Sequence, residues 1–178
     1  LKKLGCREVL FTGGEPLLYE DLPSAAKLAK NNGFYVSLST NGLLAAKKLP
    51  PAAADIDRVY ISLDYPLKQE HDAVKAQECF SEAVDAVRIA SRLGIEPVIS
   101  YTLTRDSIRF IPEMAELSHD LEVRMRFVPV HHCPELEGFE SISLEYIKRY
   151  SKNDNVAFDA QLFDLMRKGG NDPKQASC

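Results

Sequence analysis

The sequence REVLFTGGEP, residues 7–16, contains the clearest indication of the fold. Its first part, Arg7–Thr12, is a short run of apolar, β-branched and aromatic residues, which is typical of a buried strand. Gly13-Gly14 then predicts a tight turn. After the turn we expect a helix, because Asp21 offers an N-cap carboxylate and Gly33 offers a C-terminal stop. The stretch therefore begins a strand-turn-helix unit.

The same unit recurs along the chain. Four further strands are predicted from their apolar runs, at Tyr35–Thr40, Arg58–Asp64, Pro97–Thr104 and Val123–Val130. Helices are predicted between them, at Leu43–Leu49, Phe80–Leu93 and about Ser107–Ser118. Strands that alternate with helices indicate right-handed βαβ units and a parallel sheet, which is either a barrel or a doubly wound sheet.

The two ends of the chain depart from this pattern. Leu1–Gly5 is similar to the last turn of a helix with its glycine stop, so we expect a preceding βα unit to be missing. Beyond the last strand, helices are predicted near Ser143–Tyr150 and Val156–Arg167, followed by a polar tail. We therefore expect a core domain in residues 1–133 and a helical extension with a linker in residues 134–178.

The composition is that of an ordinary globular domain, with 178 residues, 45% hydrophobic, 27% charged and a formal net charge of −4. Lys and Arg are scattered along the chain, so a nucleic-acid partner is not expected. No apolar run approaches the roughly 20 residues that span a bilayer, and no signal-peptide pattern opens the chain. A membrane partner is therefore not expected either.

The four cysteines lie far apart, at Cys6, Cys79, Cys133 and Cys178. Because no CxxC or CxxxC pair occurs, a self-contained zinc or iron–sulfur site is not supported. A chain of this size can build a core without disulfides, so buried, inert thiols are the expectation for Cys6 and Cys79.

Polar residues gather where the predicted strands end. In parallel α/β folds, ligands bind beyond the carboxyl ends of the strands. The stretches at these ends are Thr12–Pro16, Ser39–Gly42, Ser62–Asp64, Ser100–Thr104 and Pro129–Cys133. They are rich in hydroxyls and amides but contain no evident pair of nucleophile and base, which suits the binding of a polar small molecule.

Individual residues in these stretches have properties suited to such a ligand. Gly13-Gly14 would let the backbone approach it closely, and Pro16 would fix the turn. Glu15 could accept hydrogen bonds from an ammonium group or a backbone amide, or could instead be a solvated or helix-capping carboxylate. Ser62 and Asp64 are two residues apart on one strand and so share a face, where they could meet a carboxylate and a ribose diol.

Three motifs occur in order on successive predicted strands: TGGEP at Thr12–Pro16, STNG at Ser39–Gly42 and ISLD at Ile61–Asp64. With them the chain, from about Lys2 to His131, resembles the radical S-adenosylmethionine (radical SAM) enzymes. It is most similar to the branch that contains the molybdenum-cofactor biosynthesis cyclase and the SPASM-type peptide-modifying enzymes. The resemblance implies an α/β fold, a partial (β/α)6 TIM-like barrel of parallel strands whose first βα unit is missing from this chain.

The resemblance also implies a site for S-adenosylmethionine at the strand ends. Gly13, Gly14 and Glu15, in the turn fixed by Pro16, would hold the methionine amino group, and Ser62 would contact the carboxylate. The other implied positions line the cavity toward substrate (Thr40, Asn41), lie near the ribose (Asp64, Ser100) or border the adenine (Val130 or His131).

Radical SAM enzymes also bind a [4Fe–4S] cluster through a CxxxCxxC loop, and this chain lacks that motif. We expect those ligands upstream of Leu1, so these 178 residues alone are not expected to be active and offer no catalytic or metal-binding residue. In the family, one electron from the cluster cleaves S-adenosylmethionine to a 5′-deoxyadenosyl radical, which abstracts hydrogen from the substrate.

The same resemblance implies the partners. They are a small-molecule or peptide substrate and an electron donor such as ferredoxin or flavodoxin. A cytoplasmic location is expected because oxygen damages the cluster. Cys178 could begin an auxiliary cluster domain or be a linker thiol.

Other interpretations stay open. The chain could be a non-catalytic βα-barrel module that binds a nucleotide-like or amino-acid ligand. Asn41-Gly42 could be a simple turn rather than a ligand contact. His131-His132-Cys133 could bind a metal, but adjacent side chains on an extended segment point to opposite sides. A metal site there is therefore not favoured.

Several charged residues have structural interpretations. His71 and His119 flank helical or loop segments and are expected on the surface. Arg124 and Arg126 share one face of the last strand and are expected to pair with carboxylates, although an anionic substrate is the alternative.

Overall fold

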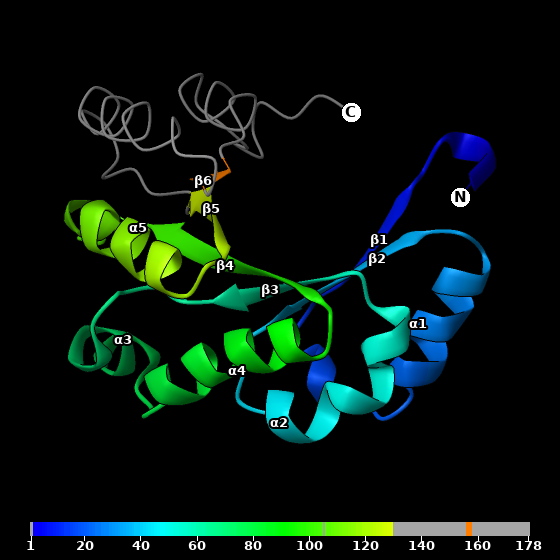
Figure 1. The fold of residues 1–178 in the computed structure, drawn as a ribbon, viewed down its shortest axis with the longest axis horizontal. Coiled ribbons are helices and arrows are strands. Elements are labelled where there is room, and N and C mark those ends of the chain that lie inside the picture. The colour runs from blue at the N-terminus through cyan, green and yellow to red at the C-terminus, as the bar shows by residue number, and fades with distance from the viewer. Residues whose placement is uncertain (1, 105, 130–155, 158–178) are drawn as a thin grey trace, which may run out of the picture. The chain divides into compact units, whose positions relative to one another are not determined.

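Strands and helices alternate along the chain in a computed structural model, which describes residues 2–104, 106–129 and 156–157 (Figure 1). The strands follow the order β1-β2-β3-β4-β5-β6. They are β1 (Glu8–Phe11), β2 (Tyr35–Thr40), β3 (Arg58–Ser62), β4 (Glu96–Leu103), β5 (Arg124–Pro129) and β6 (Val156–Ala157). β2 pairs in parallel with both β1 and β3, and β5 pairs in parallel with β6. The predicted α/β fold with parallel strands is confirmed.

Helices connect these strands. The α-helices are α1 (Leu22–Asn31), α2 (Ala45–Lys48), α3 (Lys68–Lys75), α4 (Phe80–Arg92) and α5 (Ile111–Asp120). Short 3-10 helices are η1 (Lys2–Leu4), η2 (Pro16–Leu18), η3 (Pro50–Asp55) and η4 (Ile108–Phe110). The sequence predicts all the α-helices except α3, whose residues are polar on nearly every side and show no apolar face. Among the described residues, no helix has the length and apolar character needed to cross a membrane.

The chain divides into two compact units. Unit 1 comprises Leu1–Leu63 and Leu67–Ile99, and unit 2 comprises Asp64–Pro66 and Ser100–Cys178. In unit 1, α1, α2 and α4 lie on one side of the strands (Figure 1). Val36 and Ile61 are completely buried, and α4 adds small buried side chains that let it pack closely. Unit 1 therefore has a core between its strands and its helices.

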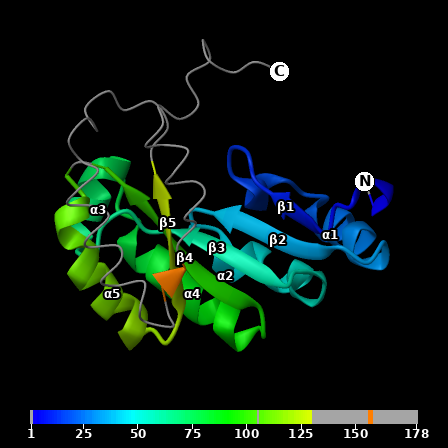
Figure 2. The ribbon, with the colours of Figure 1, turned by 90° about the horizontal axis from the view of Figure 1, so that it is seen from above.

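Unit 2 has its own core. In it α5 packs against β5, as Figure 2 shows. Met114 of α5, Met125 of β5 and Tyr101 of β4 are fully buried. Tyr101 donates a hydrogen bond to the carbonyl of Ser107, and burial raises the pKa of its phenol. Thr104 and Ser107 cap each other, because each backbone N–H donates to the other's hydroxyl at 2.8 and 3.0 Å.

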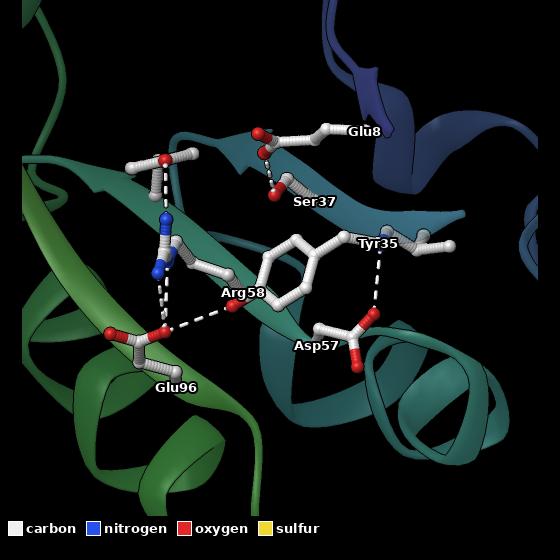
Figure 3. Close-up of polar contacts among 8 residues, drawn as sticks. Glu8, Tyr35, Ser37, Asp57, Arg58 and Glu96 are labelled. Carbon is white, nitrogen blue, oxygen red and sulfur yellow. Dashed lines mark hydrogen bonds and ion pairs between the residues drawn. The ribbon is translucent and has the colours of Figure 1, made fainter. Parts of the chain in front are cut away.

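A charged network lies at the amino-terminal ends of the strands in unit 1 (Figure 3). Arg58 donates from Nε and Nη2 to Oε2 of Glu96, each at 2.8 Å, and Tyr35 donates to the same oxygen at 3.0 Å. The guanidinium carbon lies 5.1 Å from the centre of the Tyr35 ring and 5.8 Å from that of Tyr60. This geometry combines a paired charge with cation–π contacts, so it is stronger than an isolated surface ion pair.

Three further polar contacts accompany this network, and Figure 3 shows those of Asp57 with Val36 and of Ser37 with Glu8. Asp57 accepts a hydrogen bond from the backbone N–H of Val36 at 2.8 Å and pairs with Lys30 of α1. Ser37, which is completely buried on β2, donates its hydroxyl to Glu8 on β1. The strand ends opposite the predicted site are thus joined by side chains as well as by the sheet.

Replacement of Arg58 tests this network. Arg58→Met keeps the apolar stem but removes the charge, and it should lower the free energy of unfolding by about 1.5–3 kcal/mol, the range for hydrogen bonds to charged groups. Arg88→Met is the matched control, because Arg88 pairs with Asp85 on the exposed side of α4 and should lose only about 0.3–0.5 kcal/mol. Denaturant unfolding measures both, and equal losses would contradict the assignment.

The side chain of Asp72, in α3, caps the start of the following helix, α4. Its Oδ1 accepts hydrogen bonds from the backbone N–H groups of Cys79 and Phe80 at 2.8 and 2.9 Å, and its Oδ2 pairs with Lys68. The N–H of Cys79 and the Lys68 ammonium lower the pKa of Asp72 to about 2. The carboxylate therefore caps α4 from a neighbouring helix.

The pH dependence of stability follows from that lowered pKa. Because the folded-state pKa lies below the ordinary 3.8, Asp72 stabilises the fold above about pH 4 and loses this effect as the pH falls toward 2. Asp72→Asn should therefore be less stable than the native protein at pH 7, and the difference should shrink between pH 4 and 2. Urea unfolding across pH measures this. Asp85→Asn, which removes an exposed carboxylate, should show only a small difference throughout.

Some sequence predictions are wrong. Val156–Ala157, predicted as the start of a helix, is the strand β6, and Val156 pairs with Met125 of β5. The open edge of β5 offers backbone partners to a β-branched residue, and these outweigh a weak helical pattern. The remainder of the two predicted carboxy-terminal helices lies outside the described residues.

Three predictions about single side chains also fail. His71 is not a surface residue but is 1% exposed, with its ring edge-to-face against Phe80. Cys6 is exposed rather than buried, whereas Cys79 is buried as predicted. Asp21 holds the N-cap position of α1 but its side chain makes no capping hydrogen bond. His119 is exposed, as predicted.

Candidate functional site

The candidate site lies in unit 1 where β1 and β2 end. The parallel register places Phe11 opposite Leu38, so the residues that follow the two strands emerge at the same edge of the sheet. Gly13-Gly14 and Glu15 follow β1, and Asn41-Gly42 follows β2. The sheet thus brings the first two predicted motifs together.

Glu15 connects the two strand ends. It occupies the N-cap position of η2, where its Oε1 accepts a hydrogen bond from the backbone N–H of Leu17 at 3.0 Å. The same oxygen accepts the hydroxyl proton of Thr40 at 2.7 Å, and Oε2 accepts the backbone N–H of Asn41 at 2.9 Å. The carboxylate is therefore held by three donors, two of which come from the end of β2.

The turn after β2 is held by hydrogen bonds inside the turn and by packing against α4. The backbone N–H of Gly42 donates to the Thr40 hydroxyl at 3.1 Å, and that of Leu43 donates to Oδ1 of Asn41 at 3.0 Å. Gly42 has a φ of +86°, and an added Cβ would lie 2.9 Å from Cβ of Ala86 and 3.1 Å from Cα of Ala83. Glycine is required here for both its conformation and its size. Asn41-Gly42 thus forms the turn that one interpretation of the sequence predicts.

The backbone at Gly13-Gly14 is open. Both residues are exposed, and a Cβ added to either would meet no atom within 4 Å. Gly13 has a φ of +128°, a conformation that side chains rarely adopt. A ligand can therefore approach this backbone without displacing any described atom of the chain.

This arrangement fits the amino group of S-adenosylmethionine. A carboxylate has about four acceptor positions, of which three at Glu15 are occupied by the donors described above. One position remains for an ammonium group beside the open Gly13-Gly14 backbone, and Pro16 fixes the start of η2 behind it. The chemistry of the site thus suits a cationic amine.

The other predicted site residues are distributed differently. Ser62 is the last residue of β3, in unit 1. Asp64 and Ser100 belong to unit 2, where the Ser100 hydroxyl accepts a hydrogen bond from Nε of Arg126 at 3.1 Å. Arg126 thus contacts the hydroxyl of Ser100, and the predicted pairing of Arg124 and Arg126 with carboxylates stays a prediction. Val130 and His131 lie outside the described residues, as do His132 and Cys133.

Sequence reasoning missed two features of this site. It did not identify the contact of Thr40 with Glu15 or the packing of Gly42 against α4. Both contacts join segments distant in sequence and leave no local signal. The helix-capping interpretation of Glu15 is confirmed, because its carboxylate accepts the backbone N–H of Leu17 at the start of η2.

The described residues do not fit a [4Fe–4S] cluster. Within the part of the chain that the structure describes, no group of three or more His, Cys, Asp or Glu side chains could hold a metal ion. The two cysteines in that part, Cys6 and Cys79, are far apart in sequence and differ in exposure. No step of chemistry through a cluster can therefore be assigned to these residues.

The fold and this strand-end geometry define an α/β protein with parallel strands and a cluster of polar groups at their carboxyl ends. A family model described as the Radical SAM superfamily matches residues 1–117. The chain therefore belongs to the radical SAM superfamily, whose members use S-adenosylmethionine and a [4Fe–4S] cluster. The predicted family is confirmed.

Relatives and solved structures agree with this assignment. A probable GTP 3′,8-cyclase of Methanopyrus kandleri is 35% identical over 124 residues, which are 67% of this chain and 40% of that protein. The PqqA peptide cyclase of Streptomyces rochei is 30% identical over 122 residues, 67% of this chain and 34% of that protein. The chain spans less than half the length of the curated relatives that it matches.

A solved structure shares the fold. SuiB of Streptococcus suis, solved bound to S-adenosylmethionine, has a TM-score of 0.69 and 16% identity, with coverage of 89% of this chain and 39% of that one. SuiB has also been solved bound to its precursor peptide SuiA. At this identity the likeness shows the fold, and with the family match it supports an α/β radical SAM core.

Replacement of Gly42 tests the packing behind the site. Gly42→Ala should lower the free energy of unfolding by about 1–3 kcal/mol from overpacking, in addition to the cost of its positive φ. Gly94→Ala is the matched control, because Gly94 has a φ of +73° but no atom within 4 Å of an added Cβ. Thermal or denaturant unfolding of the two variants separates the cost of overpacking from the cost of the positive φ. Equal losses of unfolding free energy in both variants would show that the contact of Gly42 with α4 does not contribute to stability.

Proposed function

We propose that this chain holds S-adenosylmethionine in a radical SAM enzyme, with Gly13, Gly14 and Glu15 binding the methionine amino group. The observation that carries the proposal is the fixed Glu15 carboxylate, with one acceptor position left beside an open glycine backbone. Pro16 orients the loop. A preorganised acceptor beside the ligand binds it without a further ordering cost.

The remaining contacts are part of the same proposal. Ser62, at the carboxyl end of β3, contacts the carboxylate of the cofactor. Thr40 and Asn41 line the cavity toward the substrate. Asp64 and Ser100 lie near the ribose, and Val130 or His131 borders the adenine. These roles come from the match of the motifs to the family, and a binding experiment on each variant tests them.

In the family, the cofactor pair supplies the difficult chemistry: reductive cleavage gives a 5′-deoxyadenosyl radical that abstracts hydrogen from the substrate. The residues of this chain bind and orient S-adenosylmethionine and exclude water from it. We propose that the cluster ligands lie outside residues 1–178 and that ferredoxin or flavodoxin delivers the electron. The acidic net charge of −4 supports the absence of a nucleic-acid partner.

The substrate is proposed to be a small molecule or a peptide. Related proteins include a GTP cyclase and a peptide cyclase, and SuiB binds a precursor peptide, so both kinds occur among proteins similar to this chain. We also propose a cytoplasmic location, since the cluster is sensitive to oxygen, and a core in residues 1–133 followed by an extension in residues 134–178.

A glycine series tests the proposed site. Because a Cβ at Gly14 meets no atom within 4 Å, Gly14→Ala should fold normally, and Gly14→Val extends the side chain further into the space of a ligand. Anaerobic calorimetry on the full-length, cluster-reconstituted protein should show S-adenosylmethionine binding weakened progressively, by about tenfold or more for valine, or about 1.4 kcal/mol. Formation of 5′-deoxyadenosine should fall in the same order.

The alternative is a non-catalytic module that binds a different nucleotide-like or amino-acid ligand. It predicts no binding of S-adenosylmethionine by the reconstituted native protein and no 5′-deoxyadenosine. Binding that is unaffected in Gly14→Val would place the cofactor elsewhere in the protein. Circular dichroism and unfolding of each variant distinguish loss of binding from loss of fold.

A further inference from the structure

The Thr40 hydroxyl is at the centre of the candidate site but cannot donate to a ligand there. Thr40 is 4% exposed. Its single hydroxyl proton goes to Oε1 of Glu15 at 2.7 Å, and its oxygen accepts the backbone N–H of Gly42 at 3.1 Å. A hydroxyl has one proton to donate, so a ligand would have to break the contact with Glu15 in order to receive it.

We propose that Thr40 is a positioning residue, which holds the Glu15 carboxylate in the orientation that recognises the amino group of the cofactor. The proposal rests on the function proposed above, and it adds the residue that orients the Glu15 carboxylate, the acceptor of the cofactor's amino group. Glu15 has several rotatable bonds, and a free carboxylate would lose rotamer freedom when it binds an ammonium group. The hydrogen bond from Thr40 restricts the Glu15 side chain to one rotamer before the ligand binds, so that binding costs less conformational entropy.

The same hydroxyl ties Glu15 to the rest of unit 1. Thr40 accepts from Gly42, and Gly42 lies directly against Ala83 and Ala86 of α4. Asn41 adds a second tie, because its backbone N–H donates to Oε2 of Glu15 at 2.9 Å. Both oxygens of the Glu15 carboxylate thus accept hydrogen bonds from the segment Thr40-Asn41, and the adjoining Gly42 packs against α4.

The experiment compares two ligands on the full-length, cluster-reconstituted protein under anaerobic conditions. One is S-adenosylmethionine, and the other is the analogue in which hydrogen replaces the α-amino group. The ratio of their dissociation constants reports recognition of the amino group, and the change of this ratio between variants reports the contribution of Thr40. Thr40→Val removes the hydroxyl at nearly constant volume, and Thr40→Ser restores it. Ser37→Ala is the matched control, because it removes another buried β2 hydroxyl that contacts Glu8 at the opposite strand end.

The expected result is a preference of the native protein for S-adenosylmethionine that falls about tenfold in Thr40→Val, on the scale of one hydrogen bond to a charged group. Thr40→Ser should retain the preference, and Ser37→Ala should retain it despite lower stability. A native preference that is unchanged in Thr40→Val overturns the positioning role alone. No native preference overturns both this role and the assignment of Glu15.

Amide hydrogen exchange gives a second measurement that needs neither ligand nor activity. In the native protein the N–H groups of Asn41 and Gly42 should exchange slowly, because each donates to a side-chain oxygen of the site. Thr40→Val should speed exchange at both positions, and Thr40→Ser should not. If Thr40→Val fails to fold, fast exchange of these two amides in the native protein would by itself overturn the proposal.

Discussion

The candidate site depends on the three hydrogen bonds that the carboxylate of Glu15 accepts. This carboxylate lies at the start of η2, directly after β1, yet two of its three donors belong to the end of β2. Parallel pairing of the two strands makes this contact possible, because it brings both strand ends to one edge. The residue that we propose binds the amino group of the cofactor is thus also the residue that joins two βα units.

The sequence predicted the framework well for a physical reason. Strand runs such as Tyr35–Thr40 and Arg58–Asp64 are rich in β-branched and aromatic residues, and glycine ends the adjoining helices, so local preference and tertiary structure agree. The family motifs are likewise local, which is why three short stretches were sufficient to indicate the radical SAM superfamily.

The failures have equally specific causes. α3 is polar on most sides and buries His71, so its one buried contact gives no periodic pattern. β6 forms because β5 offers a partner, which its own short sequence cannot reveal. The contact between Thr40 and Glu15 spans 25 residues, and neither residue type indicates the other. Local sequence therefore predicted which residues gather at the site better than how they bond to one another.

The close packing of Gly42 against α4 extends the site's requirements into the core. The Cβ of Ala86 lies where a side chain at position 42 would project, so a larger side chain at position 86 would press on the turn that carries Thr40 and Asn41. Positions 42 and 86 are therefore coupled through their volumes. In descendants of this sequence, a position in a helix away from the candidate site is constrained by the backbone of a turn within it.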